Sequence, residues 1–238
     1  GGPAVALAGS YETPVTELLR GIVDKAGDPK INVVVRNMRL PRICTAVIAG
    51  AGLGVVGCVL QVILDNPLAS ASTLGVSQGA SFGAAFAIIG LHAGTQSGGS
   101  VWISLAAFVG SMGVAVVILG LSGLSQISPE SIVLAGVAIS SMFTGATTLL
   151  QYFADEVELT TLTFWTFGDL GSAGWGQIRF MFLIVLIVSI YFIMHRWDFN
   201  ALLAGTETAQ SLGIHVRRLI LISMVLCCVT ACTIVSHV

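Results

Sequence analysis

Long runs without a charged residue constrain the fold of this chain more than any other feature. The run Ile43–Leu64 contains 22 residues and no Asp, Glu, Lys or Arg. As a helix with a rise of about 1.5 Å per residue, it would be about 33 Å long. This length matches the hydrocarbon thickness of a lipid bilayer, so the run predicts a helix that crosses a membrane.

The composition of the chain favours an integral membrane protein. Of its 238 residues, 55% are hydrophobic and 9% are charged, whereas a soluble domain has about 25% charged residues. The mean hydropathy is +0.94. The formal net charge of −2 argues against a nucleic-acid partner, which would favour a basic patch. We therefore expect an all-α fold, a polytopic bundle of membrane helices in the lipid bilayer.

Six apolar runs are candidate membrane spans. We predict spans at Ile43–Leu64, Leu74–Leu91, Val101–Leu121, Ser131–Phe153, Arg179–Met194 and Leu219–Val238. Residues 1–42 are mixed and polar, and Glu12 to Lys25 could form a short amphipathic surface helix. Segment 154–177 is acidic and aromatic, and predicts a short helix on the membrane surface, where aromatic rings collect. Its acidic residues, Glu158 among them, would keep it out of the lipid.

Glycines recur every four positions in the first two of these runs. Gly50 and Gly54 lie in the first run, and Gly75, Gly79 and Gly83 lie in the second. This spacing places them on one helical face, and small residues allow membrane helices to approach backbone to backbone. We expect these glycines at helix contacts. Spacing alone is also typical of any tightly packed pair of membrane helices.

A second stripe of small residues lies in the fourth run. Its members are Gly136, Ser140, Thr144 and Thr148, again four positions apart. The stripe could serve helix packing or could line a path through the protein. Spacing does not separate these two interpretations.

The cysteines give no sign of a disulfide framework or a metal site. They are five in number and all lie in apolar runs, at positions Cys44, Cys58, Cys227, Cys228 and Cys232. An odd number in such places disfavours a set of disulfides. Cys228 and Cys232 share a helical face, but two thiols lack further ligands. We expect them to be buried small hydrophobic residues, and we predict no metal site.

The interiors of the predicted spans contain no ionisable residue among Asp, Glu, Lys and Arg, and Arg179 lies at a span end. Such residues mark proton relays and ion pathways in membranes, so a proton-coupled transporter and a membrane aspartyl protease are disfavoured. The chain also lacks the GxxxxGK[ST] pattern of a phosphate-binding loop. We therefore predict no enzyme, and expect any energy source to lie on another polypeptide.

Three short motifs follow one another between positions 39 and 80. They are RLPR at Arg39–Arg42, NPLA at Asn66–Ala69 and LGVSQGA at Leu74–Ala80. In this order and at these separations they closely resemble the permease subunit of the binding-protein-dependent ABC importers for iron–siderophore complexes, haem and cobalamin. The resemblance implies about ten spans, so we expect the first span and the last three to lie outside the given sequence.

The resemblance also implies a function and a set of partners. A permease of this family would pair with a second copy of itself or a close paralogue in the cytoplasmic (inner) membrane. Two ABC ATPase subunits would bind inside, carrying ATP and Mg, and a solute-binding protein would bind outside. No cofactor is expected on this chain. The cargo would be an iron–siderophore complex or similar metal chelate, with cobalamin or haem as the alternative. A non-transporting membrane scaffold, or a membrane enzyme whose catalytic part lies elsewhere, is the alternative of another class.

The same resemblance assigns roles to residues at both mouths of the path. Arg39 and Arg42, beside Pro41, would form the dock for the solute-binding protein; lipid contact by long basic side chains is the simpler alternative. Asn66, Pro67 and Leu68 would form a cytoplasmic gate, with Pro129 and Glu130 beside them. The alternative for the gate is a simple turn, since Pro67 ends a helix.

Segment 195–218 is a long polar connection between the last two predicted spans. Its core, GTETAQSLG, predicts a short helix with Thr206 as the N-cap and a stop at Gly213. An ordinary solvated loop helix is one interpretation. The string also resembles the coupling helix of the family, which contacts the ATPase. The residues carrying that resemblance are Gly205, Glu207, Ala209, Gln210, Leu212 and Gly213.

Charge counting and the resemblance predict opposite orientations. Residues 1–42 contain six Lys or Arg, and 195–218 contains three, so the excess of positive charge on cytoplasmic loops would place the first segment inside. The family places RLPR outside and the coupling segment inside. We adopt the family's orientation, in which residues 1–238 are one transmembrane permease domain with 1–42 extracytoplasmic and 195–218 cytoplasmic.

Overall fold

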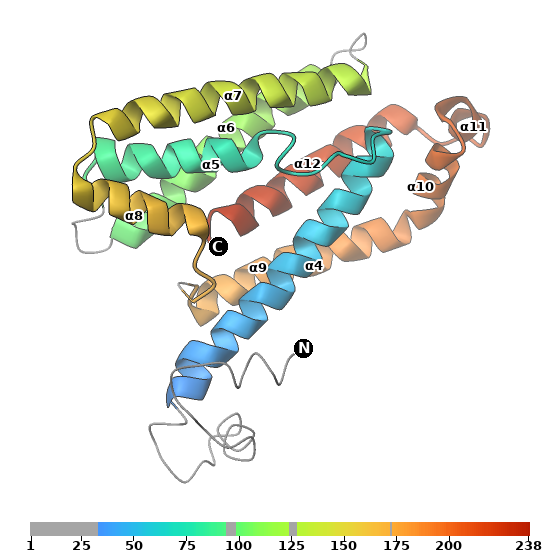
Figure 1. Ribbon diagram of the computed structural model, residues 1–238. Coiled ribbons are helices and arrows are strands. Elements are labelled where there is room, and N and C mark those ends of the chain that lie inside the picture. Colours follow the sequence, from blue (N-terminus) through green and yellow to red (C-terminus); the bar gives the residue numbers. More distant parts are fainter. Residues whose placement is uncertain (1–32, 94–98, 124–127, 172) are drawn as a thin grey trace.

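The computed structural model describes residues 33–93, 99–123, 128–171 and 173–238, and these residues form helices and loops with no strand among them (Figure 1). The predicted helix within 1–32 lies outside the described residues. The helical segments are η1 (Val35–Arg39), α4 (Leu40–Ile63), α5 (Val76–Ala85), η2 (Phe86–Gly90), α6 (Gly99–Gly123), α7 (Pro129–Tyr152), α8 (Glu156–Phe167), α9 (Trp175–Met194), α10 (Arg196–Leu203), α11 (Thr206–Ser211) and α12 (Val216–Val235).

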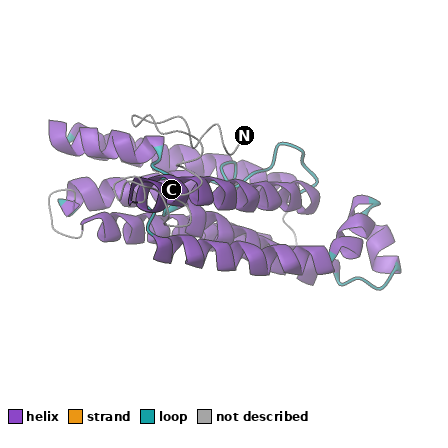
Figure 2. Ribbon diagram, turned by 90° about the horizontal axis from the view of Figure 1, so that it is seen from below, coloured by secondary structure: helices purple, strands orange, loops and turns teal. Residues whose placement is uncertain are grey.

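Helix α12 joins two groups of helices into one bundle. It contacts α4 and α9 on one side and α5 and α6 on the other, while α7 packs on α5 and α6 (Figure 1). Its buried side chains include Met224, Cys227, Cys228 and Cys232. The long helices run side by side, and the α10–α11 pair extends from one end of the bundle (Figure 2).

Five helices in the described part of the chain are long and apolar enough to cross a membrane. They overlap five of the six predicted spans, with the first beginning at Val35 and not at Ile43, and this confirms an all-α, multi-pass fold. The remaining span, predicted at Leu74–Leu91, is the shorter apolar helix Val76–Gly90. At 15 residues it is about 22 Å long. It is enclosed by other helices, and irregular backbone at membrane depth is tolerated where it is buried in protein.

The first helix begins earlier than predicted, and Pro41 lies inside it. The helix is continuous through the π-helical turn η1, in which the Leu40 N–H bonds to the Val35 carbonyl. Proline lacks an N–H and its ring crowds the preceding turn. The π turn η1 directly precedes this proline, so Arg39 and Arg42 both lie within one continuous helix. This corrects the boundary placed at position 42.

The structure places glycines of the second run at a close helix contact, but not those predicted in the first run. Gly79 and Gly83 lie where α5 meets α6: a methyl group added at Gly79 would lie 2.7 Å from the Gly110 carbonyl oxygen, and one at Gly83 would collide with the Ala106 carbonyl. A methyl group at Gly50 or Gly54 would have no described neighbour within 4 Å. The glycine of α4 that makes a close contact is Gly52, against Ile234 and Val185, because the face of α4 that meets α12 and α9 is offset from the predicted one.

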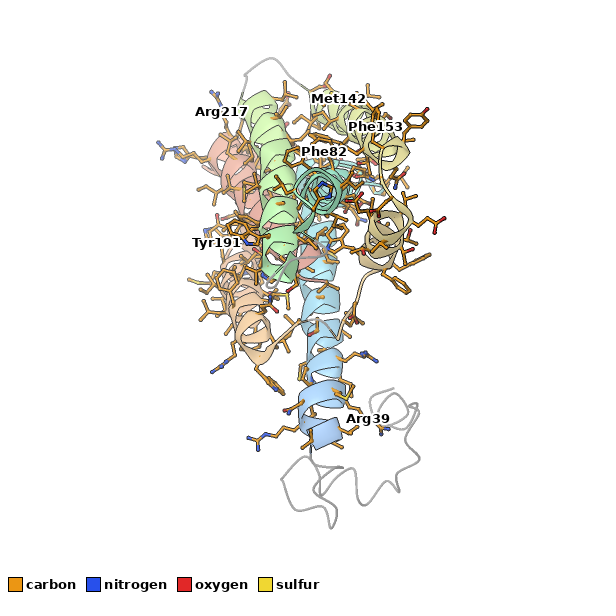
Figure 3. All side chains as sticks on the ribbon, turned by 90° about the vertical axis from the view of Figure 1, so that its left-hand side faces the viewer. Arg39, Phe82, Met142, Phe153, Tyr191 and Arg217 are labelled. Atoms are coloured by element: carbon orange, nitrogen blue, oxygen red, sulfur yellow. The ribbon has the colours of Figure 1, made fainter. Side chains whose placement is uncertain are left out.

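Large apolar side chains cover the outward faces of the long helices (Figure 3). On α9 they include Phe180, Leu183, Ile187 and Ile190, each about half exposed. Exposed apolar surface of this extent is unusual on a soluble protein and suits lipid or a further helix. Three of the cysteines are buried as expected, Cys44 is half-buried, and Cys58 is exposed on the outward face of α4.

Candidate functional site

The NPLA motif forms a compact turn between α4 and α5. Asp65 has a positive φ of 45°, which reverses the chain directly after the helix. The Asn66 side-chain oxygen accepts a hydrogen bond from the Leu68 N–H at 2.9 Å. The Gln61 side chain, still on α4, donates to the Pro67 carbonyl at 2.9 Å. These bonds tie the turn to the end of α4, and Leu68 is left 80% exposed.

The second half of this connection is ordered by two hydroxyl side chains. The Thr73 hydroxyl accepts from the Ser70 N–H at 2.9 Å and donates to the Ser70 carbonyl at 2.8 Å. Gly75 then starts α5 with φ of 81°, a conformation that favours glycine. A methyl group there would lie 2.9 Å from the Ser140 hydroxyl oxygen. The glycine therefore allows the start of α5 to approach α7 closely.

Helix α7 begins with a capped turn at the same end of the bundle as the NPLA turn (Figure 1). The Ser128 hydroxyl caps the helix by accepting from the Ser131 N–H at 3.4 Å. Pro129 is the first helical residue and Glu130 is exposed in the first turn. Two turns further, Gly136 meets the connection itself, because a methyl group there would lie 2.5 Å from the Thr73 carbonyl oxygen.

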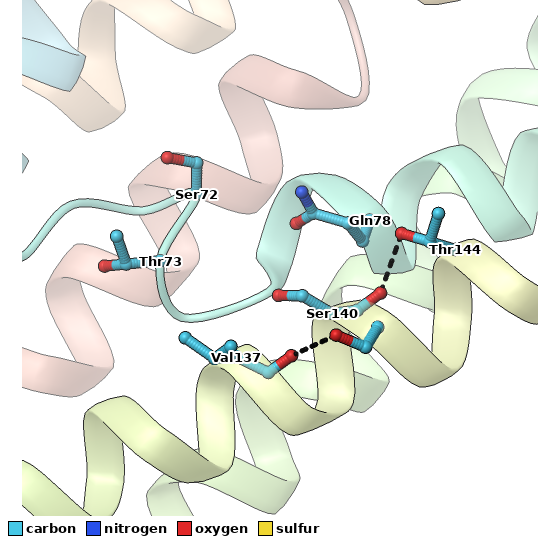
Figure 4. A pocket seen from close by; sticks show the side chains of 7 residues that line it. Ser72, Thr73, Gln78, Val137, Ser140 and Thr144 are labelled. Carbon is cyan, nitrogen blue, oxygen red and sulfur yellow. Dashed lines mark hydrogen bonds between the residues drawn. The ribbon is translucent and has the colours of Figure 1, made fainter.

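A polar recess of about 430 Å³ opens between α5 and α7 (Figure 4). Its lining residues are Ser72, Thr73, Gln78, Val137, Ser140, Ser141 and Thr144. The small-residue stripe of α7 therefore divides: Gly136 packs against the connection, while Ser140 and Thr144 line the recess. Gln78 and Ser141 were missed by the sequence analysis. Gln78 had a local signal, a lone amide within an apolar run, whereas only the structure identifies the neighbours of Ser141.

Segment 195–218 forms a pair of short helices, α10 and α11. Gly205, with φ of 115°, is the N-cap of α11, and Thr206 is its first residue; the predicted cap at Thr206 was therefore one position late. The stop at Gly213 is confirmed. Gly213 has φ of 83°, its N–H bonds to the Gln210 carbonyl at 2.9 Å, and the Ile214 N–H bonds to the Ala209 carbonyl at 3.1 Å. These two bonds form a Schellman motif, which fixes the end of a helix.

One face of α11 is anchored and the other is exposed. Ala209 is fully buried, while Glu207 and Gln210 are exposed and Leu212 is 67% exposed. The preceding helix α10 is held to the bundle by buried Phe199 and Leu202. The segment thus presents acidic, amide and apolar side chains on a rigid support.

Arg39 and Arg42 lie at the opposite end of the bundle from α11. Figure 3 shows Arg39 far from Arg217, which is on the first turn of α12. Arg42 has a side chain 60% exposed, and its nearest contact with Asp169 is 4.0 Å. Exposed ion pairs of this kind contribute about 0–1 kcal/mol, so the Arg42 charge is left available to a partner.

Beyond the end of η2, His92 makes a hydrogen bond to α8 that the sequence analysis missed. Glu158 accepts at 2.6 Å from His92 Nδ1, and its other oxygen accepts from the Asp155 N–H at 3.1 Å. The Asp155 side chain in turn accepts from the Glu158 N–H at 2.8 Å, which completes a capping box. Glu158 was expected to be solvated, but it is buried at 7% exposure. No local pattern predicts this pair, because its members are 66 positions apart.

The long apolar helices, the polar recess between two of them and the short α10–α11 pair at one end define a multi-pass membrane protein. The chain belongs to the FecCD transport family, whose model matches residues 4–238. No group of three or more His, Cys, Asp or Glu that could hold a metal ion occurs in the part of the chain that the structure describes.

Several relatives are permeases of ABC transporters. An ABC transporter permease protein of Methanocaldococcus jannaschii is 47% identical over 223 residues, covering 91% of this chain and 64% of the relative. The hemin transport system permease of Yersinia pestis is 32% identical, covering 80% of this chain and 58% of that protein. The vitamin B12 import system permease of Vibrio vulnificus is also 32% identical, with 82% and 59% covered. The chain thus spans about three fifths of the length of these relatives.

A solved structure shares the fold. It is described as a metal-chelate type ABC transporter in an inward-facing conformation. Its TM-score with this chain is 0.80 at 28% identity, with 98% of this chain and 71% of that chain covered. The resemblance inferred from the three motifs is therefore confirmed at the level of family and fold.

Proposed function

We propose that this chain is part of the membrane-spanning permease subunit of an ABC importer. It would carry a metal chelate across the cytoplasmic membrane, with ATP and Mg bound by a separate ATPase subunit. The observation that carries the proposal is α11, a helix anchored by buried Ala209 and ended by a Schellman motif at Gly213, whose exposed face has no packing role within the described residues. A rigid element of this kind can transmit movement between subunits, whereas a floppy loop cannot.

The coupling contact is proposed for Glu207, Gln210 and Leu212. Their exposed side chains would enter a groove of the ATPase, while buried Ala209 holds the helix on the bundle. Gly205 and Gly213 would set the angle at which the helix leaves and rejoins the chain, since both have positive φ. Each would be strained by a side chain.

The gate is proposed at Asn66, Pro67 and Leu68, with Pro129 and Glu130 at the same end. Support comes from the hydrogen-bonded NPLA turn, which holds Leu68 out of the core. A cysteine at position 68 should change its reactivity toward a thiol reagent between the ATP-bound and nucleotide-free states of the transporter. Constant reactivity would indicate that the NPLA turn is a simple connection and not a gate.

Docking of a solute-binding protein is proposed at Arg39 and Arg42, which lie at the end of the bundle opposite α11. Charge pairs at a protein surface act mainly on association and orientation. The double change Arg39→Glu and Arg42→Glu should abolish stimulation of ATP hydrolysis by the binding protein and spare basal hydrolysis. Retained stimulation would assign these arginines to lipid contact.

A second copy, or a close paralogue, is proposed to complete the path beside α7. Most of α7 is exposed in this chain, since only 11% of its most apolar stretch is buried. That exposed side carries hydroxyl side chains along one edge. These hydroxyls would be unfavourable against lipid, but they would be solvated if they faced a path shared by the two copies. The cargo is proposed to be an iron–siderophore complex or similar chelate, or alternatively cobalamin or haem.

The test uses the full-length permease together with its proposed ATPase partner. A photo-crosslinking residue placed at Gln210 should capture the ATPase, because α11 would lie in its groove. The matched control is Thr163, an exposed residue on α8 at the other end of the bundle, where no capture is expected. Capture at neither position, together with failure of any ATPase to copurify, would favour a non-transporting scaffold.

A further inference from the structure

The connection between α8 and α9 places an acidic side chain beside Arg42. The Asp169 Oδ1 atom lies 4.0 Å from Nη2 of Arg42, and the two side chains are 63% and 60% exposed. Gly171 leaves space for the guanidinium, because a methyl group there would lie 2.6 Å from Nη2 and 3.2 Å from Nε of Arg42. The head group of Arg42 therefore lies against the backbone of this connection, with its outer side open to a partner.

Contacts that do not involve Asp169 hold the same connection on the first helix. The Trp175 Nε1 atom donates to the Arg36 carbonyl at 3.3 Å. Ala173 is buried, and its cluster packs against Cys44 of α4. Burial of apolar surface and a hydrogen bond to the backbone are independent of the charge at position 169. The charge of Asp169 can therefore be removed while the connection stays in place.

The geometry of the Asp169–Arg42 pair suits exchange more than permanent attachment. The Asp169 Oδ1 atom accepts from the Gly171 N–H at 2.8 Å, so a shorter bond to the backbone fixes the carboxylate. Its distance of 4.0 Å from Arg42 is longer than a charge-assisted hydrogen bond of about 2.7–2.9 Å. The two groups attract each other without a hydrogen bond at this distance. Even so, the negative charge lowers the positive potential that Arg42 presents to an acidic partner.

We infer that Asp169 is an internal counter-ion of the dock, which pairs with Arg42 in the free permease and is replaced by a carboxylate of the solute-binding protein. This inference rests on the docking role proposed for Arg42. One exposed carboxylate replaces another, and each such pair is weak, so the contact forms and releases readily. Asp169 thereby lowers the affinity of the dock for its acidic partner and keeps docking reversible.

The experiment measures the dissociation constant of the proposed solute-binding protein on the full-length permease, held with its proposed ATPase in lipid nanodiscs. Asp169→Asn removes the charge and keeps an oxygen that can accept from the Gly171 N–H. Glu156→Gln is the matched control, since it makes the same change of charge on the exposed first turn of α8, at the far end of that helix from Asp169. Both changes are also made in an Arg42→Gln background.

We expect Asp169→Asn to lower the dissociation constant about two- to fivefold at low ionic strength, the size of one exposed pair, and the gain should fade as salt screens the charges. Glu156→Gln should have no effect. Arg42→Gln should weaken docking by about fivefold or less, which keeps binding measurable, and should reduce the gain from Asp169→Asn because no internal pair is left to break.

Three results would overturn the inference: unchanged or weaker docking in Asp169→Asn, an equal gain in Glu156→Gln, or an undiminished gain in the Arg42→Gln background. The last of these would mean that Asp169 only repels the partner at long range. If the unmodified permease docks the binding protein in any of these cases, the proposed function survives. If the unmodified permease docks no binding protein, the proposed function and the inference both fail.

Discussion

Helix α5 meets its two neighbours in different ways. Against α6, glycines on both helices bring backbone to backbone: Gly79 and Gly83 face Gly110 and Ala106. Against α7, close approach is limited to the start of α5, where Gly75 lies beside Ser140 and the preceding turn meets Gly136. Beyond this point the two helices leave the polar recess between them.

The difference separates a structural contact from a functional one. Membrane helices have no hydrophobic drive to associate, so close van der Waals packing holds them together. The α5–α6 contact has this packing along its length and leaves no room for a ligand. The α5–α7 contact is held at the start of α5 and by the Phe82–Phe143 ring pair, whose centroids are 5.3 Å apart, and it also leaves a polar recess lined by hydroxyls. We therefore expect α6 to remain fixed on α5 and α7 to be the neighbour that moves.

The largest effect is expected from Gly83→Ala, which tests the α5–α6 contact. The added methyl group would collide with the backbone carbonyl of Ala106, and backbone cannot rotate away as a side chain can. Overpacking of this kind costs about 1–3 kcal/mol. The thermal unfolding midpoint of the purified protein should fall.

Gly145→Ala is the matched control for this prediction. Gly145 lies on the exposed side of α7, where a methyl group would have no described neighbour within 4 Å. Alanine is the better helix former by about 1 kcal/mol, so the midpoint should stay level or rise. An equal fall in the unfolding midpoint from both substitutions would mean that close packing of α5 on α6 is not the cause of the loss.

A smaller loss of stability is expected from Gly136→Ala at the α5–α7 contact. The methyl group would lie 2.5 Å from the Thr73 carbonyl oxygen, but Thr73 belongs to a connection that can shift where a helix cannot. The free energy of unfolding should fall by about 1 kcal/mol, the lower end of the range for overpacking, while the proposed transport activity falls by a larger factor because the recess changes shape. Unfolding and uptake are measured on the same preparation. A stability loss as large as that of Gly83→Ala would make the two contacts equivalent.

The smallest effect is expected from Glu158→Gln, which weakens the tie between His92 and α8. The amide oxygen can still accept from the Asp155 N–H, so the helix cap is retained, but the charge opposite His92 is lost. The His92 side chain is 72% exposed, whereas that of Glu158 is 9% exposed, so solvent screens the pair from the His92 side and its loss should cost about 1 kcal/mol. Hydrogen exchange should therefore quicken in α8 and η2, which contact each other and α5, and stay unchanged in α6.

Glu156→Gln provides the comparison for this prediction, since Glu156 is exposed on the same first turn of α8. Its exchange pattern should match that of the unmodified protein. If Glu158→Gln quickened exchange in α6 as well as in α8, the His92–Glu158 contact would support the whole bundle and not only the side that faces α7.

Several features of the fold follow from short stretches of sequence. Uncharged runs long enough to cross a bilayer predicted five of the long helices, because the cost of unpaired backbone in lipid leaves few alternatives. The stop at Gly213 was predicted for an equally local reason, since glycine adopts positive φ without strain. The three motifs near the start predicted the family. Roles at the gate, the dock and the coupling helix came from that resemblance and stay proposals.

Other features depend on which residues meet across the bundle, and these were missed or misplaced. Spacing predicted Gly50 and Gly54 as contact residues, yet the α4 face that meets α12 and α9 is marked by Gly52. A repeat of four residues defines a stripe on a helix but not the direction in which that stripe points. Glu158 looked like a solvated acidic residue for the same reason, because its partner His92 is distant in sequence.

The sequence by itself determined that this chain is a helical, multi-pass membrane protein of a known transport family. Length, hydropathy and local backbone preference act within one helix, and each can be evaluated from neighbouring residues. Only the tertiary structure decided that α5 packs tightly on α6 and leaves a recess toward α7, and that the α7 hydroxyls beside this recess donate to the backbone of their own helix. These properties depend on the rotation and separation of whole helices, which many weak contacts set together and no single motif encodes.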